Sequence, residues 1–218
     1  MSAETVRVII DDLGALLLFT MILILAAGQI YRAIYAVAAQ SFFIAVASAV
    51  LAIATGNMDL WVIAGIALTV KTIALPWVLH SVVRRMNVRR EVEPVIPIAG
   101  TLALAVIVVV MSFNLSATLS PVNQAITGNA LPVGIALTLL GVLVMATSNT
   151  ALTQMVGLFA SENGIFFTAM AVTQGMPFII EIGVILDVIL AVLVMAIMVL
   201  RVRSTIDADI ANLDRLRG

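Results

Sequence analysis

Long apolar runs separated by short polar segments dominate the sequence. A helix needs about 20 mostly apolar residues to cross the hydrocarbon core of a bilayer, and runs of this length recur with few charges inside them. The pattern therefore predicts an all-α integral membrane protein with about seven membrane-spanning helices. The predicted spans are approximately residues 8–30, 34–55, 60–83, 94–115, 131–150, 152–174 and 176–201.

The segments between these runs contain residues that commonly end helices. TGNMD separates the second run from the third, Pro94 opens the fourth, and TQGMP precedes the seventh. The weakest break is ATSNTALTQ, between the fifth and sixth runs, because it is polar but has neither a charge nor a proline. Six spans are therefore the alternative to seven.

Composition agrees with this class and narrows the chemistry. The sequence is 63% hydrophobic and 11% charged, with a mean hydropathy of +1.21, which excludes an ordinary soluble domain. Its net charge of −1 gives no basic surface for nucleic acid. Because there is one histidine and no cysteine, we expect no metal, haem or iron–sulfur site within this protein.

The distribution of basic residues predicts the orientation, since Lys- and Arg-rich loops stay on the cytoplasmic side. With seven spans and the N-terminus outside, Arg32, RRMNVRR at 84–90 and RVR at 201–203 all become cytoplasmic. The acidic residues near the other helix ends then lie outside: Glu4, Asp11, Asp12 and Asp59. The N-terminal stretch contains no basic region or small-residue cleavage site, so we expect an uncleaved first span.

Three parts of the protein follow from this topology. Residues 1–93 form an N-terminal three-helix membrane part, and residues 94–203 form the C-terminal helices. Apolar residues recur at helical spacing in 204–218 with charges on the other sides. This pattern predicts a short amphipathic cytoplasmic tail that lies on the membrane surface or against a partner subunit.

Apart from Asp11, Asp12, His80 and Arg201 near the span ends, four charged or chargeable acidic and basic residues lie inside the predicted spans: Lys71, Glu162, Glu181 and Asp187. A charge at mid-membrane costs about 3 kcal/mol on insertion scales, so such residues usually face a protein interior or a hydrated cavity. At a rise of ~1.5 Å per residue, Lys71, Glu162 and Asp187 lie ~15–18 Å from a span end, close to the midplane. Glu181 is shallower, ~8 Å below the outer end.

These groups are the candidate stations of a proton pathway. Glu181 and Asp187 are about 120° apart around their helix and ~9 Å apart along it, so they cannot share one proton directly. Glu162, on the antiparallel neighbouring span, falls between them in depth. Burial disfavours the charged form of a carboxyl or an amine, which favours proton exchange. The alternative is that Lys71 forms a buried salt bridge with Glu162 or Asp187 that only fixes helix packing.

Several nearby residues could support such a pathway. Pro76 has no amide hydrogen, so the carbonyl of Thr72 should lose its helical partner and the helix should kink beside Lys71. Asn163 could orient a water or another side chain. His80 is interpreted as a helix-end residue at the cytoplasmic interface, with proton entry as the alternative.

Small and polar residues within the runs indicate helix contacts. Gly157, Gly164 and Gly183 would let helices approach closely around the acids. Gln40 and Ser41 are interpreted as a packing hydrogen-bond pair in the second span.

Particular stretches resemble hydrogenase-4 component E, a membrane subunit of formate hydrogenlyase-type and other group 4 nickel–iron hydrogenase complexes. They are GLFASENG at 157–164, IEIGVILDVILAVLVM at 180–195 and DADIANLDRLRG at 207–218, with YRAIYAVAAQS at 31–41 and KTIALP at 71–76.

Residues 131–203 are further similar to the small K (4L) subunit of respiratory complex I and to the C subunit of multisubunit cation/proton antiporters. Acids in the second and third helices of the K subunit belong to its proton path, which implies these roles for Glu162 and Asp187. In the K subunit the acid directly follows Gly-Leu, whereas here Phe159 follows Gly157-Leu158.

The resemblance implies a non-catalytic subunit of a prokaryotic cytoplasmic (inner) membrane complex. It would contribute to proton, or sodium, translocation coupled to electron transfer. The nickel–iron centre and iron–sulfur clusters would lie in partner subunits, and no cofactor is expected in this protein itself. The expected partners are the lipid bilayer and other membrane subunits, which would resemble the antiporter-like subunits and the H subunit of complex I. Two alternatives remain: a component of a multisubunit cation/proton antiporter without a redox partner, and a purely structural linker subunit.

Overall fold

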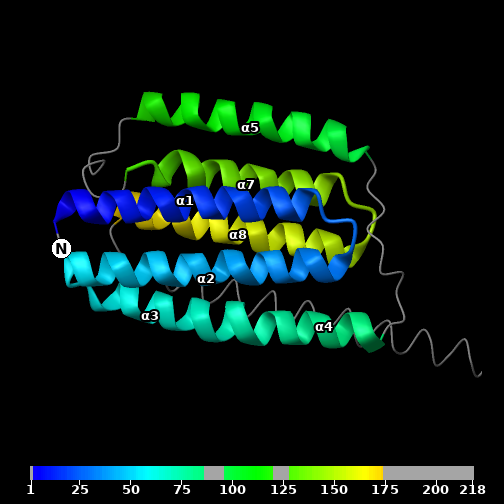
Figure 1. Ribbon diagram of the computed structural model, residues 1–218, viewed down its shortest axis with the longest axis horizontal. Coiled ribbons are helices and arrows are strands. Elements are labelled where there is room, and N and C mark those ends of the chain that lie inside the picture. Colours follow the sequence, from blue (N-terminus) through cyan, green and yellow to red (C-terminus); the bar gives the residue numbers. More distant parts are fainter. Residues whose placement is uncertain (1, 86–95, 120–127, 174–218) are drawn as a thin grey trace, which may run out of the picture.

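The computed structural model describes residues 2–85, 96–119 and 128–173, and every element in these ranges is a helix (Figure 1). The predicted seventh run, the tail, and with them Glu181, Gly183 and Asp187 lie outside the described residues. In sequence order the elements are α1 (Ala3–Leu25), α2 (Ile30–Thr55), α3 (Met58–Ile66), the π-helix η1 (Ala67–Ala74), α4 (Leu75–Arg85), α5 (Ile98–Leu119), α7 (Ala130–Ala146) and α8 (Ala151–Thr173).

The described helices lie side by side along one long axis, and α3, η1 and α4 form one continuous rod (Figure 1). The first three rods alternate in direction, so the start of α2 and the end of α4 lie at the same end of the bundle. Arg32 and Arg84 are at that end, whereas Glu4 and Asp59, in the first turns of α1 and α3, are at the other. The described charges outside the centre are thus largely separated by sign.

The predicted membrane class agrees with the length and apolarity of these helices. Within the described residues, four helices are long and apolar enough to cross a membrane, and α7 is a shorter apolar helix. The four are Ala3–Leu25, Ile30–Thr55, Met58–Ser81 and Ile98–Thr118. Large apolar side chains such as Val106, Val110 and Met111 of α5 are exposed on the bundle surface, as expected for helices surrounded by hydrocarbon or further protein. The described part of the protein is therefore all-helical, and its long apolar helices are compatible with a membrane protein.

The ends of some helices differ from the apolar runs. α1 begins at Ala3, earlier than the run at 8–30, because the Ser2 hydroxyl accepts a hydrogen bond from the Thr5 N–H at 3.2 Å and caps the helix. α1 ends at Leu25, and α2 begins at Ile30, so Arg32 lies in the first turn of α2 rather than in a loop. The uncertain break after the fifth run is confirmed, because α7 ends at Ala146 and α8 begins at Ala151.

A seam of glycines joins α7 to α8, which pack together more extensively than any other described pair. A Cβ added at Gly157 would lie 2.8 Å from the carbonyl oxygen of Gly141, and one at Gly164 would lie 2.8 Å from that of Gly134. The two backbones are therefore in direct contact, which any larger residue would prevent. The close approach predicted for Gly157 and Gly164 is confirmed, and it fixes α8 against α7.

Candidate functional site

A buried ion pair joins the third predicted span to the sixth. The Nζ of Lys71, on η1, lies 2.9 Å from Oε1 of Glu162, on α8, and their side chains are 5% and 2% exposed. Among the described residues these are the two charged side chains in the buried class. The sequence left open whether Lys71 would meet Glu162 or Asp187. The described structure places it against Glu162.

The pair lies near the middle of the bundle in depth. Lys71 is ~20 Å from each end of the α3–η1–α4 rod, and Glu162 is ~16 Å from each end of α8, at a rise of ~1.5 Å per residue. This agrees with the mid-span depth predicted for both residues. Such a depth is too great for either charge to reach water by extending its own side chain past the helix end.

Lys71 is carried by a π-helix, in which the backbone hydrogen bonds span five residues instead of four. The N–H of Leu75 donates to the carbonyl of Val70, and the hydroxyl of Thr72 donates to the carbonyl of Ala67 at 2.9 Å. The element ends just before Pro76, whose missing N–H already interrupts the α-helical pattern there. The sequence predicts a kink at Pro76 and a Thr72 carbonyl without its helical partner. The described structure shows widened turns N-terminal to the proline, and Lys71 lies inside them.

An aromatic ring adjoins the ion pair. Phe166 follows Glu162 by one helical turn on α8, and the Nζ of Lys71 lies 4.2 Å from the centroid of its ring. An ammonium at this distance is attracted by the negative face of the ring. Sequence reasoning did not identify Phe166, although its spacing of four residues from Glu162 places it on the same helix face.

Asn163 connects the site to α2. Its Nδ2 donates hydrogen bonds to Oε1 of Gln40 at 3.2 Å and to Oγ of Ser41 at 3.1 Å, and all three side chains are buried. Gln40 in turn reaches Sδ of Met21 on α1 at 3.9 Å. Gln40 and Ser41, interpreted from sequence as a packing pair, therefore bind the residue next to Glu162. Their polar character inside an apolar run was the available signal.

Polar contacts thus run across the bundle at one depth, from η1 through α8 to α2. In the described residues, Oδ1 of Asn163 is a buried acceptor without a hydrogen-bond partner. Buried polar atoms are usually satisfied by protein or by ordered water. The sequence predicts that Asn163 orients a water or another side chain, and its hydrogen bonds in the described structure are with the side chains of Gln40 and Ser41.

His80 is remote from the pair. It lies in α4 near Arg84, and its ring packs on Tyr31 of α2 with centroids 4.8 Å apart. It follows Lys71 by more than two helical turns, toward the basic end of the bundle. Whether it is only a helix-end residue or a point of proton entry stays a prediction.

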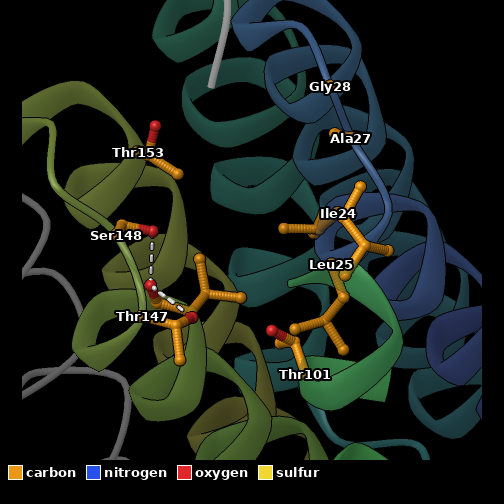
Figure 2. A pocket seen from close by; sticks show the side chains of 10 residues that line it. Ile24, Leu25, Ala27, Gly28, Thr101, Thr147, Ser148 and Thr153 are labelled. Atoms are coloured by element: carbon orange, nitrogen blue, oxygen red, sulfur yellow. Dashed lines mark hydrogen bonds between the residues drawn. The ribbon is translucent and has the colours of Figure 1, made fainter. Parts of the chain in front are cut away.

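A small cavity lies at the basic end of the bundle. Its volume of about 40 Å³ is room for about two or three water molecules. The cavity is lined by the ends of α1 and α7, the segments that follow them, and the beginnings of α5 and α8. Figure 2 shows the hydroxyl-bearing side chains of Thr101, Thr147, Ser148 and Thr153 around it. The hydroxyl of Ser148 donates to the carbonyl of Val144 at 2.5 Å. Neither Lys71 nor Glu162 lines this cavity.

The geometry allows a restricted set of chemistry. A proton can move between the Lys71 amine and the Glu162 carboxylate, and the pair stays neutral overall in both arrangements. Removing one partner would take this ion-pair contact away from the other buried charge, and breaking a buried pair typically costs about 3–5 kcal/mol. No group of three or more His, Cys, Asp or Glu side chains placed to hold a metal ion occurs among the residues described.

Comparison with known proteins gives one informative relationship. No protein-family model and no solved structure matches the sequence. Over 156 residues it is 33% identical to the uncharacterized protein Rv0085 of Mycobacterium tuberculosis, and the match covers 70% of this chain and 71% of that protein. Identity of this level over most of both proteins shows common descent, and the chain therefore belongs to the same protein family as Rv0085.

Proposed function

We propose that this protein is a non-catalytic membrane subunit that contributes the buried Lys71–Glu162 pair to a proton or sodium path. The path would serve a complex I-like, group 4 hydrogenase-type oxidoreductase whose electron transfer takes place in partner subunits. The observation that carries this proposal is the ion pair itself, closed at 2.9 Å and buried at the middle of the bundle.

The energetics of buried charges support a functional role. Replacing a buried ion pair by apolar residues of similar volume is often neutral or stabilising, so stability alone rarely requires one. A lysine–carboxylate pair can accept or release one proton, and the charge of the pair then changes by one unit. Ionisable groups at this depth in membrane proteins commonly belong to ion or proton pathways.

The sequence resemblance supports the kind of complex. Glu162 lies in the stretch GLFASENG, and Lys71 lies in KTIALP, two of the segments that resemble hydrogenase-4 component E. Asp187 and Glu181 would continue the path on the seventh span. Membrane subunits resembling the antiporter-like and H subunits of complex I would be the neighbours, and they or other partners would hold the nickel–iron centre and the iron–sulfur clusters.

The proposed topology has seven spans in a prokaryotic inner membrane, with the N-terminus outside and the C-terminus in the cytoplasm. Its support is the separation of Arg32 and Arg84 from Glu4 and Asp59 at opposite ends of the bundle. Cysteine is absent from the sequence, so single cysteines at Glu4 and Arg84 can be labelled in intact cells with a membrane-impermeant maleimide. Labelling at Arg84 but not at Glu4 would reverse the orientation.

A structural role is the second candidate, and the closed geometry of the pair favours it. The pair does not line the described cavity, as expected for a static contact that fixes η1 against α8. Under this reading the charges can be removed together without loss of function.

One experiment separates the two roles. The tagged protein is purified from its host with its partners, and redox turnover and ion pumping are measured for Glu162→Gln and for the double variant Lys71→Met/Glu162→Leu. A proton path predicts that the double variant assembles but pumps poorly, whereas a structural pair predicts that it assembles and pumps normally. Glu4→Gln is the control, because Glu4 is exposed in the first turn of α1.

The same preparation tests the class of complex. Co-purified hydrogenase-type redox subunits would support the oxidoreductase. If only antiporter subunits co-purify, the ion path would belong to a cation/proton antiporter instead.

A further inference from the structure

Phe166 and Glu162 together surround the ammonium of Lys71. They are four residues apart on α8, so both side chains project from one face of that helix toward η1. The Nζ of Lys71 is 2.9 Å from the carboxylate and 4.2 Å from the ring centroid. The widened turns of η1 carry Lys71 into this position.

The ring and the carboxylate act differently on the two protonation states of the pair. The face of an aromatic ring carries negative electrostatic potential and attracts a cation, and the attraction grows when the cation is removed from water. A neutral amine has no net charge for the ring to attract. The ring therefore stabilises the ammonium–carboxylate arrangement selectively, while a neutral amine and a neutral acid gain little from it.

We infer that Phe166 is a positioning residue that keeps the shared proton on Lys71. When the proton leaves Nζ for a Glu162 oxygen, the N–H bond breaks, an O–H bond forms, and both groups become neutral without another reactant. Phe166 opposes this transfer, so the pair remains charged at rest. The significance of this effect for transport rests on the proposed function, but the effect on proton position does not.

The proton position can be read directly, because Lys71 is the only lysine in the sequence. Full-length protein labelled with ¹⁵N-lysine in lipid nanodiscs gives one Nζ signal, and its chemical shift in solid-state NMR distinguishes ammonium from amine. We expect an ammonium in the wild type. Its Hε protons should also be shifted upfield by the ring current of Phe166.

Three variants separate the charge effect from packing. Phe166→Leu should lower the ammonium-to-amine ratio by about thirtyfold, as expected for loss of a desolvated cation–π contact, and should remove the upfield shift. Phe166→Tyr retains an aromatic face and should resemble the wild type. Phe167→Leu makes the same change at the next residue, which is buried in the core, and should leave the Lys71 signal unchanged.

A ring with altered electrostatics keeps the test decisive if Phe166→Leu fails to fold. Pentafluorophenylalanine introduced at position 166 has nearly the shape of phenylalanine but a positive ring face, and it should shift the proton toward Glu162 more strongly than leucine does. An unchanged ammonium signal in the folded leucine or pentafluorophenylalanine variant would overturn the inference. Normal pumping by the Lys71→Met/Glu162→Leu variant would instead overturn the proposed function and leave this measurement untouched.

Discussion

Replacing Lys71 by methionine removes one charge of the buried pair while keeping an unbranched side chain of similar length. At a separation of 2.9 Å and an effective dielectric constant of 20, the Coulomb attraction between two unit charges is about 6 kcal/mol. The measured loss should be smaller, because Glu162 can take up a proton and local structure can relax. We expect Lys71→Met to lower the free energy of unfolding by about 3–5 kcal/mol, the usual cost of breaking a buried ion pair by removing one partner.

Variants of Glu162, alone and together with Lys71→Met, give the interaction energy between the two side chains. Glu162→Leu alone should be destabilising by a similar amount, because it removes the carboxylate that lies 2.9 Å from the buried ammonium. The double variant Lys71→Met/Glu162→Leu should return to within about 1 kcal/mol of the wild type, since neither charge remains. The double-mutant cycle then isolates the interaction between the two side chains.

The assay is reversible unfolding in mixed micelles with increasing denaturing detergent. Trp61 and Trp77 lie on the same rod as Lys71, one on either side of it, and their fluorescence follows the unfolding of that helix. Glu4→Gln serves as the control for loss of an exposed carboxylate. A Lys71→Met variant within about 0.5 kcal/mol of the wild type would refute the reasoning, because such a result is typical of a solvated ion pair.

Two other predictions concern the elements that position the pair. Gly157→Val should destabilise the protein by about 2 kcal/mol or more, since the valine side chain would meet the backbone of Gly141. Gly65→Ala should leave stability nearly unchanged, because a Cβ at Gly65 meets nothing within 4 Å. Equal stability of the two variants would contradict the close packing of α7 and α8. Deleting Leu68 should restore α-helical geometry before Pro76 and turn Lys71 away from Glu162. The free energy of unfolding should then fall about as much as in Lys71→Met, by roughly 3 kcal/mol. The control Leu68→Ala should have a small effect, because Leu68 is 42% exposed. Thermal unfolding of the deletion variant at the wild-type temperature would show that the widened turns do not position Lys71.

The π-helix explains why these two elements matter together. A helix with one extra residue in a turn presents its side chains about one position further around the axis, or ~100°. The glycine seam fixes α8 against α7. Lys71 and Glu162 therefore meet because each helix is held at a particular rotation by its own local sequence.

Much of this architecture can be predicted from the sequence alone. Apolar runs of about 20 residues predict helices, since in hydrocarbon the backbone must satisfy its own hydrogen bonds. Counting residues along those helices gives the depth of Lys71 and Glu162. Glycines at Gly157 and Gly164 indicate close helix contact, and Pro76 indicates an interruption.

The tertiary structure decides which residues meet. Helices that are apolar on every side carry little information about which faces point inward, so the sequence could not choose a partner for Lys71 between Glu162 and Asp187. The contacts of Asn163 with Gln40 and Ser41 join residues more than a hundred positions apart, and no local pattern encodes them. The position of Lys71 over Phe166 likewise depends on how η1 and α8 both pack against α2. Sequence sets the depth and local geometry of each group along its helix, because these depend on neighbouring residues, whereas contacts between helices depend on packing among segments that are distant in sequence.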